Sequence, residues 1–257
     1  RQTSMYLTFN VMYLGFVSNN TEVGYYTTAF KLYSVILGLF TAFTNVMLPR
    51  MSSLLAEGEQ KKFQSLINKS FSVVITFCIP LILCSMILAP QIVYVLSGSG
   101  YEGAILPMRI IMPAILFVGI AQVLAVQVLM PMKKDKVLLI ASVVGAIVSL
   151  LINLLMVPYI ESVGSAVVLL CSEAVVTGTY LWYVLSHKLT LISVKAIVKS
   201  VLYSLPSVVV CWGCGQWIEN EFVGVGCAVM LAGIVWMIIQ VTVQTCLLYT
   251  SDAADDK

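Results

Sequence analysis

Charged residues are scarce in this sequence: its 257 residues include 14 Lys or Arg and 12 Asp or Glu, together 10%. Soluble globular domains carry about 25% charged residues. Hydrophobic residues instead make up 60% of the chain, and the mean hydropathy is +0.99. Uncharged runs of about 20 residues recur along the whole length, and each can cross the ~30 Å hydrocarbon core of a bilayer as a helix. The composition therefore excludes an ordinary soluble domain and predicts an all-α, polytopic helical membrane protein.

Residues and motifs that bind metals or nucleotides are also rare. His187 is the single histidine and has no second ligand near it in the sequence, so we expect no metal site. No G-x-x-x-x-G-K-[ST] loop is present for ATP, and the longest polar connection, about 20 residues, cannot hold a catalytic domain. We therefore expect no enzyme activity, no cofactor and no nucleic-acid partner. Most of the seven cysteines lie inside apolar runs, where cysteine packs as a small hydrophobic residue.

The clearest element is a helical hairpin over residues 131–173. The run Val137–Val157 has no charged residue, and its 21 residues span about 30 Å as a helix. Three lysines precede this run, and the turn MVPYIESVGS follows it. A second apolar run then returns with one acid, Glu173, near its middle. The stretch predicts two antiparallel transmembrane helices joined by a short turn.

The same criterion predicts about eight spans along the chain, separated by polar or proline- and glycine-containing turns. The first run is shorter than a full span. The polar stretch Met51–Ser70 has an amphipathic spacing, which favours a short helix lying on the membrane surface. The expected spans are Thr3–Val17, Gly24–Leu48, Phe71–Leu96, Ala104–Met130, Val137–Val157, Gly164–Leu185, Ile197–Trp217 and Gly224 to about Gln244.

Alternate loops differ in charge without exception. One set contains ten Lys or Arg residues, and the other contains five glutamates and no basic residue. The basic loops are 50–70, 132–136 and 186–199; the acidic loops are 18–23, 97–103, 159–163 and 218–222. Basic loops of membrane proteins face the cytoplasm. We therefore expect a multi-pass protein with both ends of this chain in the cytoplasm.

Lys31 is the most informative charge inside a predicted span. It lies on one polar stripe along an otherwise apolar helix, and intramembrane charges are candidates for function because their insertion costs about 2.5–3.5 kcal/mol. The stripe consists of Thr27, Lys31, Ser34, Gly38, Thr41 and Asn45. Small residues alone favour helix packing. The added Lys and Asn favour a water-filled cavity, although a packing seam stays open as the alternative.

Two further charges lie within predicted spans. Arg109 is about one and a half turns into its span, where it either snorkels to the interface or binds substrate. Glu173 lies near the middle of the membrane, where snorkelling is hard. It is either a neutral, hydrogen-bonded acid or a carboxylate that couples transport to a proton or another cation. The sequence does not separate these alternatives.

Several segments resemble the polysaccharide repeat-unit flippases (Wzx-type) of the MOP exporter superfamily. These segments are GFVSNNTEVGYYTTAFKLYS with NVMLPRMSSL, SGSGYEGAILPMRII, and KKDKVLLIASVVGAIVSLLINLLMVPYIESVGSAVVLLCSEAVV. The similarity covers about residues 4–188 and includes the hairpin Asn153…Pro158…Gly164 and the pair Ser172-Glu173. Each motif is loose, but their order and spacing together are fairly specific.

The resemblance implies two lobes of twelve to fourteen helices in total around a cavity that opens to one side at a time. This chain is similar to helices seven to fourteen, so the first lobe would be a missing N-terminal partner. Such flippases carry undecaprenyl-pyrophosphate-linked oligosaccharides across the bacterial cytoplasmic membrane for O-antigen, capsule or exopolysaccharide synthesis. Their cavities tend to be cationic, which Lys31 and Arg109 would match. Asn10, which stands where many relatives have an acid, would be a further residue of the cavity.

Other functions stay open at this stage. A multidrug or cation antiporter of the same superfamily should have more acids in this lobe than Glu173 alone. A peptidoglycan-precursor flippase would use a similar lipid carrier. An integral-membrane polysaccharide polymerase should have a large external loop with basic residues or histidine, which the acidic loops lack. A purely structural membrane protein is the remaining alternative.

Both ends of the sequence resemble translated sequencing adapters: Arg1-Gln2 at the start and CLLYTSDAADD from Cys246. We therefore expect residues 1–2 and 246–257 to be scars and the rest to be a fragment of a longer protein. Within it, residues 3–188 should form a six-helix second-lobe bundle, and residues 189–245 should add two transmembrane helices.

Overall fold

The computed structural model describes residues 3–187, 194–217 and 221–255, and every regular element in these ranges is a helix. The elements are α1 (Thr3–Val17), α2 (Asn20–Ala56), α3 (Gln60–Ile87), α4 (Ala89–Ser97), the 3₁₀ helix η1 (Glu102–Ala104), α5 (Ile105–Ile111), α6 (Ala114–Gln122), the π-helix η2 (Val123–Leu129), α7 (Asp135–Ser186), α8 (Val194–Trp217) and α9 (Glu221–Asp255). The all-α fold is therefore confirmed.

Four of the described helices are long and apolar enough to cross a membrane: α2, α3, α7 and α9. The bent pair formed by Glu102–Ile111 and Ala114–Leu129 makes a fifth such segment. The protein is thus a multi-pass membrane protein, while the count of eight spans stays a prediction. Large apolar side chains such as Leu154 and Leu155 are exposed on α7, as expected for a surface in contact with lipid tails.

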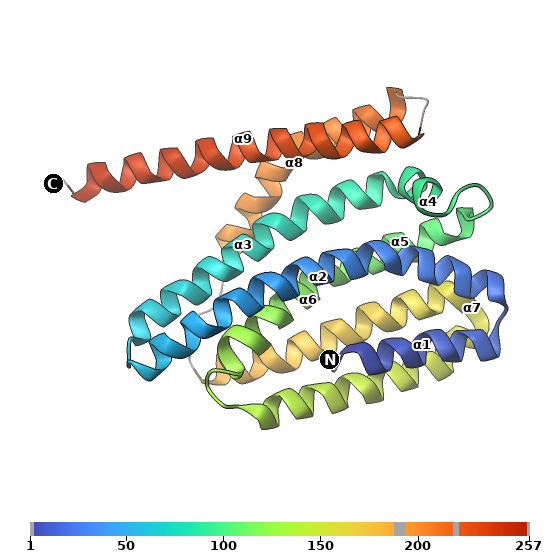
Figure 1. The fold of residues 1–257 in the computed structure, drawn as a ribbon, viewed down its shortest axis with the longest axis horizontal. Helices are drawn as coiled ribbons and strands as arrows, with labels where there is room; N and C mark the ends of the chain where they lie inside the picture. The colour runs from blue at the N-terminus through green and yellow to red at the C-terminus, as the bar shows by residue number, and fades with distance from the viewer. Residues whose placement is uncertain (1–2, 188–193, 218–220, 256–257) are drawn as a thin grey trace.

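Helix α7 is two helices joined by a tight reversal. Its 52 residues would be about 78 Å long if straight, more than twice the hydrocarbon core. Ile160 and Glu161 leave the helical conformation, and Glu161 has φ +45°. Figure 1 shows the two halves running back along each other. The reversal lies inside the turn that the sequence predicts between the fifth and sixth spans.

The connection between the second and third spans differs from the prediction. Helix α2 continues through Pro49 to Ala56, and α3 begins at Gln60, so no separate surface helix covers Met51–Ser70. The turn falls at Gly58, whose φ of +75° is the left-handed conformation that ends many helices. Met51 and Phe63 are buried on either side of this turn. Burial of these side chains holds both helices together beyond the point where the polar sequence suggested a break.

The main core lies between α1, α2, α3, α5, α6 and α7. Helix α2 supplies an aromatic and aliphatic face that includes Tyr26, Tyr33 and Phe40, and η2 packs against it. Helices α8 and α9 pair with each other and lie along α3 and α4, with a small core of their own around Leu88, Cys211 and Ala228. The proposed division near residue 188 stays a prediction, because residues 188–193 lie outside the described ranges.

The predicted adapter-derived ends are only partly within the described structure. Residues 1–2 and 256–257 lie outside it, and the side chains from residue 243 onward do too. The backbone of α9 continues as helix to Asp255, past residue 245 where the sequence places the end of the last span. The boundary at residue 245 therefore stays a prediction.

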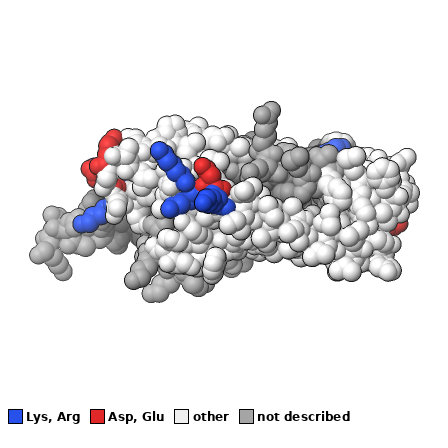
Figure 2. All heavy atoms as spheres, turned by 90° about the horizontal axis from the view of Figure 1, so that it is seen from below, with Lys and Arg blue, Asp and Glu red and all other residues white. Residues whose placement is uncertain are grey.

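The turns gather at two opposite ends of the bundle (Figure 1). The α2–α3 turn and residues 130–134 lie at one end, which we call the basic end because loops 50–70 and 132–136 hold seven of the predicted loop cations. The α1–α2, α4–η1 and α7 turns lie at the other, which we call the acidic end after Glu22, Glu102 and Glu161. In Figure 2 charged atoms cluster mainly toward one end, and most of the visible face between the ends is uncharged.

Candidate functional site

The predicted polar stripe forms one face of α2, which we call the polar face. Lys31, Ser34, Gly38 and Asn45 are exposed, while Thr27 and Thr41 are half-buried. The opposite face of the same helix is buried in the core through Tyr26, Tyr33 and other apolar residues. The predicted spacing therefore brings these six residues onto one side of α2. This is the side that the described chain leaves exposed.

Most hydroxyl groups on the polar face bond to their own helix. Thr27 Oγ1 donates to the Val23 carbonyl at 2.8 Å, and Ser34 Oγ donates to the Lys31 carbonyl at 2.7 Å. Thr41 donates to the Leu37 carbonyl and also accepts from Gln122 Nε2 at 3.3 Å. These side chains can therefore face either water or an apolar phase. The Lys31 ammonium is the one full charge on this face.

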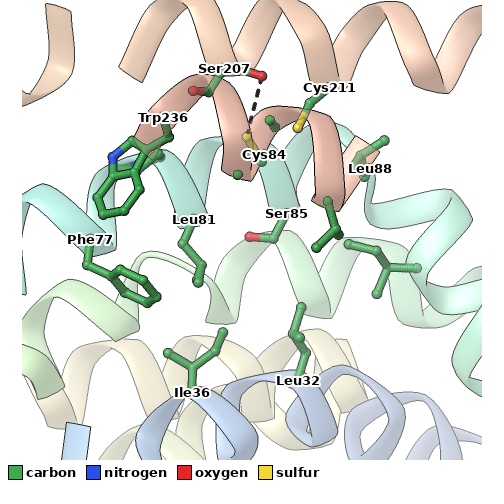
Figure 3. Close-up of a pocket in the computed structure, with 15 residues that line it drawn as sticks. Leu32, Ile36, Phe77, Leu81, Cys84, Ser85, Leu88, Ser207, Cys211 and Trp236 are labelled. Atoms are coloured by element: carbon green, nitrogen blue, oxygen red, sulfur yellow. Dashed lines mark hydrogen bonds between the residues drawn. The ribbon is translucent and has the colours of Figure 1, made fainter. Parts of the chain in front are cut away.

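An apolar cavity of about 360 Å³ lies beside α2, between α3, α8 and α9. Figure 3 shows Leu32 and Ile36 on its α2 side, Phe77, Leu81 and Cys84 from α3, and Ser207, Cys211 and Trp236 from the α8–α9 pair. No charged residue lines it. Its Ser85 hydroxyl is already bonded to the Ile82 carbonyl at 3.0 Å. The cavity suits a hydrocarbon chain better than a polar ligand.

The polar face and this cavity lie on different sides of α2. Lys31 precedes Leu32 directly, and one residue is about 100° of rotation on an α-helix. Leu32 and Ile36 line the cavity, whereas Lys31, about 100° and 140° around the helix from them, is exposed. One helix therefore exposes a cation on one side and contributes to an apolar cavity with another. An amphipathic molecule with an anionic head matches this arrangement.

Arg109 is exposed on α5, where its Nε donates to the Met86 carbonyl at 3.2 Å. Met86 belongs to the last turn of α3, whose final carbonyls lack helical partners. A cation at a helix C-terminus also interacts favourably with the helix dipole. This contact gives Arg109 a structural partner, and the sequence could not distinguish this role from substrate binding.

Asn10 lies in the interior, unlike the cavity position expected for it. Its side chain is 1% exposed. Its Nδ2 donates to the Tyr26 hydroxyl and to the Ser165 carbonyl, both at 3.1 Å. The amide thus joins α1, α2 and the second half of α7. The physical reason for the difference is that a planar amide can serve two interior acceptors at once.

Glu173 is buried as well, with 1% of its surface exposed. Its carboxyl group lies close enough to the phenols of Tyr26 and Tyr180 to interact with them electrostatically. The Tyr26 hydroxyl also accepts the hydrogen bond from Asn10. The structure therefore separates the candidates into an exposed group around Lys31 and an interior group around Glu173.

Two polar features escaped the sequence analysis. Gln127 is fully buried in the π-helix η2, and neither of its side-chain polar atoms has a hydrogen-bond partner among the described residues. At the acidic end, Ser18 donates to Glu161 at 2.9 Å and Ser162 donates to Glu22. A π-helix such as η2 is often found at functional sites, but no local sequence pattern predicts one. Within the described residues, no cluster of three His, Cys, Asp or Glu could hold a metal.

Comparison with known sequences supports the resemblance. The sequence model of the family described as "Polysaccharide biosynthesis protein" matches residues 3–106. A protein of Escherichia coli (strain K12) named "Putative O-antigen transporter" is 29% identical over 191 residues, covering 72% of this chain and 45% of that protein. A protein of the same name from Shigella dysenteriae is 28% identical over 176 residues, covering 68% and 43%. The chain thus spans under half the length of these relatives.

Among solved structures, the chain is similar to "Lipid II flippase MurJ, inward closed conformation". The TM-score is 0.79 at 18% identity, over 95% of this chain and 52% of that one. At this identity the match shows the fold alone. The predicted architecture, a half of a MOP-type transporter, therefore agrees with the structural neighbour.

Proposed function

We propose, from the premise that this chain is a relative of the Wzx-type polysaccharide flippases of the MOP exporter superfamily, that it forms half of a lipid-linked oligosaccharide flippase. The cargo would be an undecaprenyl-pyrophosphate-linked repeat unit, moved from the inner to the outer leaflet of the bacterial cytoplasmic membrane by alternating access. The relatives carry the names of transporters rather than enzymes, in agreement with the expected lack of catalysis.

One observation carries the proposal: α2 exposes a cation, Lys31, on one side and lines an uncharged cavity with another. A polyprenyl pyrophosphate has an anionic head and a long hydrocarbon tail. Lys31 offers an ammonium to the head, and an ammonium acts as a point charge toward phosphate. Leu32 and Ile36 open onto a cavity of about 360 Å³ that suits part of the tail. Neither surface alone would favour this class of cargo over a small ion or a drug.

The exposed polar face also supports a second lobe. A helix surface that carries Lys31 and Asn45 is costly against hydrocarbon. In the described chain no helix covers it, and the solved MurJ chain is about twice as long as the matching region. We place the missing N-terminal lobe opposite this face, with the transport cavity between the two. The basic end would be cytoplasmic, because cytoplasmic loops are rich in Lys and Arg.

Glu173 is the candidate for coupling to an ion, a proton or sodium. Its burial means that a negative charge there is unfavourable without a cation or proton. The Tyr26 phenol connects it to Asn10, and α1, α2 and α7 meet at this point. Loading and unloading of a cation at Glu173 would therefore change the packing of three helices. This supports a coupling role distinct from the cargo contact at Lys31.

The other candidate cargoes differ in chemistry. A peptidoglycan precursor carries the same lipid pyrophosphate, so the site around Lys31 would suit it equally, and the fold of MurJ matches. A multidrug or cation antiporter would need acids facing the cavity. The acid found within the membrane, Glu173, is instead buried. The polar face of α2 therefore favours a phosphate-bearing cargo over a cationic one.

The test is substitution of Lys31 in the full-length protein, with surface polysaccharide as the readout. We expect Lys31→Ala to abolish export and Lys31→Arg to keep part of it, because the charge survives while its geometry changes. Lys62→Ala is the matched control, since it removes an exposed cation at the basic end. Immunoblots of membranes must show equal protein levels. Normal export by Lys31→Leu would overturn the cavity role and leave the polar face as a packing seam.

A further inference from the structure

A shallow, open hollow lies along one face of α3 at the basic end, apart from the polar face of α2. All of its lining residues come from one helix and are spaced three, four or one apart, so they form a single face. They are Lys61, Gln64, Ser65, Asn68, Lys69 and Ser72. The face thus combines two cations with four neutral hydrogen-bonding side chains.

The depth of this hollow in a membrane follows from the length of α3. The helix has 28 residues and is about 42 Å long, so about 12 Å of it must extend beyond a ~30 Å hydrocarbon core. Its uncharged part begins after Lys69, and Val73, one turn further, is 54% exposed. Lys69 and Lys61 therefore lie at or just beyond headgroup depth, above a surface that contacts acyl chains.

The two cations are available to a ligand. Lys62 forms an ion pair with Glu59 at 3.0 Å, two turns before Lys69 on nearly the same side of the helix. Neither Lys61 nor Lys69 has a carboxylate within ion-pair distance among the described residues. Gln64 Nε2 donates to Asn68 Oδ1 at 3.1 Å, which fixes these two amides between the lysines. The arrangement presents donors to an anion and no acid of its own.

We propose that this hollow, the α3 headgroup site, binds the phosphate-bearing headgroup of an anionic phospholipid of the cytoplasmic leaflet. Clusters of Lys and Arg beside the cytoplasmic end of a transmembrane helix attract anionic lipids. The lysines contact the phosphate, the amides and hydroxyls contact the glycerol headgroup, and the acyl chains lie along the surface that includes Val73. This inference does not depend on the proposed cargo.

The experiment titrates the purified full chain in neutral detergent with short-chain phosphatidylglycerol, short-chain phosphatidylcholine and inorganic phosphate. Native mass spectrometry counts bound lipid, and the thermal unfolding midpoint reports stabilisation. We expect phosphatidylglycerol to bind and stabilise, and the other two not to. The double variant Lys61→Gln/Lys69→Gln should weaken phosphatidylglycerol binding on the order of tenfold, since each lysine near the surface contributes to anionic-lipid affinity.

The matched control is Lys133→Gln/Lys134→Gln, which removes the same charge from exposed positions of the basic end outside α3. It should leave phosphatidylglycerol binding within about twofold of the unsubstituted chain. Equal loss in both double variants would show diffuse attraction and overturn the site. Equal binding of phosphatidylcholine would also overturn it. Stabilisation by inorganic phosphate alone would assign the hollow to free phosphate instead.

Discussion

The two ends of the bundle use their charged residues in opposite ways. At the acidic end, carboxylates bind across the fold: Glu161 accepts from Ser18, and Glu22 accepts from the backbone and side chain of Ser162. At the basic end, the recorded ion pair is local, between Lys62 and Glu59, three residues apart. The acids thus join the α1–α2 turn to the reversal of α7, while the lysines lie on exposed helix surfaces.

Glu22 illustrates how much one acid contributes at the acidic end. It lies in the first turn of α2, where a negative charge is favoured by the helix dipole. Its backbone N–H donates to Asn19 Oδ1, the N-cap of the same helix, at 3.0 Å. Its carboxylate reaches Ser162 on α7. The comparison indicates that the acids stabilise helix packing at the acidic end. The exposed lysines of the basic end serve instead to orient the protein in the membrane.

The largest expected effect tests the rigidity of the acidic end through Gly164, two residues beyond Ser162. An added Cβ at Gly164 would lie 3.0 Å from Val157 Cα and 3.1 Å from Val157 N. Both are backbone atoms, so the two halves of α7 would have to separate. We expect Gly164→Ala to lower the free energy of unfolding by about 1–3 kcal/mol, measured as a lower thermal midpoint in detergent.

Gly178→Ala is the control within the same helix. Nothing lies within 4 Å of a Cβ at Gly178, and alanine is the better helix former by up to about 1 kcal/mol. Its midpoint should therefore stay the same or rise. Equal destabilisation by both substitutions would mean that the close approach at the α7 reversal does not hold this end together.

The second effect concerns the contact between Glu22 and Ser162, which a double-mutant cycle can isolate. Hydrogen bonds to charged groups contribute about 1.5–3 kcal/mol, and partial exposure lowers this. We expect a coupling free energy of about 1 kcal/mol between Glu22→Ala and Ser162→Ala, measured by chemical denaturation in detergent. Pairing Glu22→Ala with Ser34→Ala, on the exposed face of α2, should give a coupling near zero. Equal values would contradict the cross-bundle role of Glu22.

Much of the fold follows from local sequence. Runs without charge fixed the place of the long helices, because a charge inside hydrocarbon is unfavourable. The reversal of α7 at Ile160 and Glu161 lies in a segment with proline, glycine and polar residues. The end of α2 did not follow in this way. Pro49 and Arg50 suggested a stop, yet burial of Met51 outweighs the backbone hydrogen bond that proline removes.

The candidate site was predictable only where one helix determines it. The three- and four-residue spacing around Lys31 defines a face by itself, and the structure exposes that face. The partners of Asn10 are 16 and 155 residues away, and Arg109 bonds to a carbonyl 23 residues away. Such contacts depend on how helices pack, which spacing within one helix does not encode. The role of Lys31 in transport stays a prediction.

The smallest expected effect concerns the ion pair between Lys62 and Glu59 at the basic end. Lys62 and Glu59 are 3.0 Å apart, but their side chains are 68% and 42% exposed. Water and salt screen exposed pairs, which typically contribute about 0–1 kcal/mol. We expect Lys62→Gln to change the free energy of unfolding by less than about 0.5 kcal/mol, in chemical denaturation at low and at high salt. The change should be smaller than that of Glu22→Gln, which keeps the size of the side chain and removes only its charge. If Lys62→Gln were the more destabilising of the two, the basic end would also be held by specific contacts, and the distinction between the ends would fail.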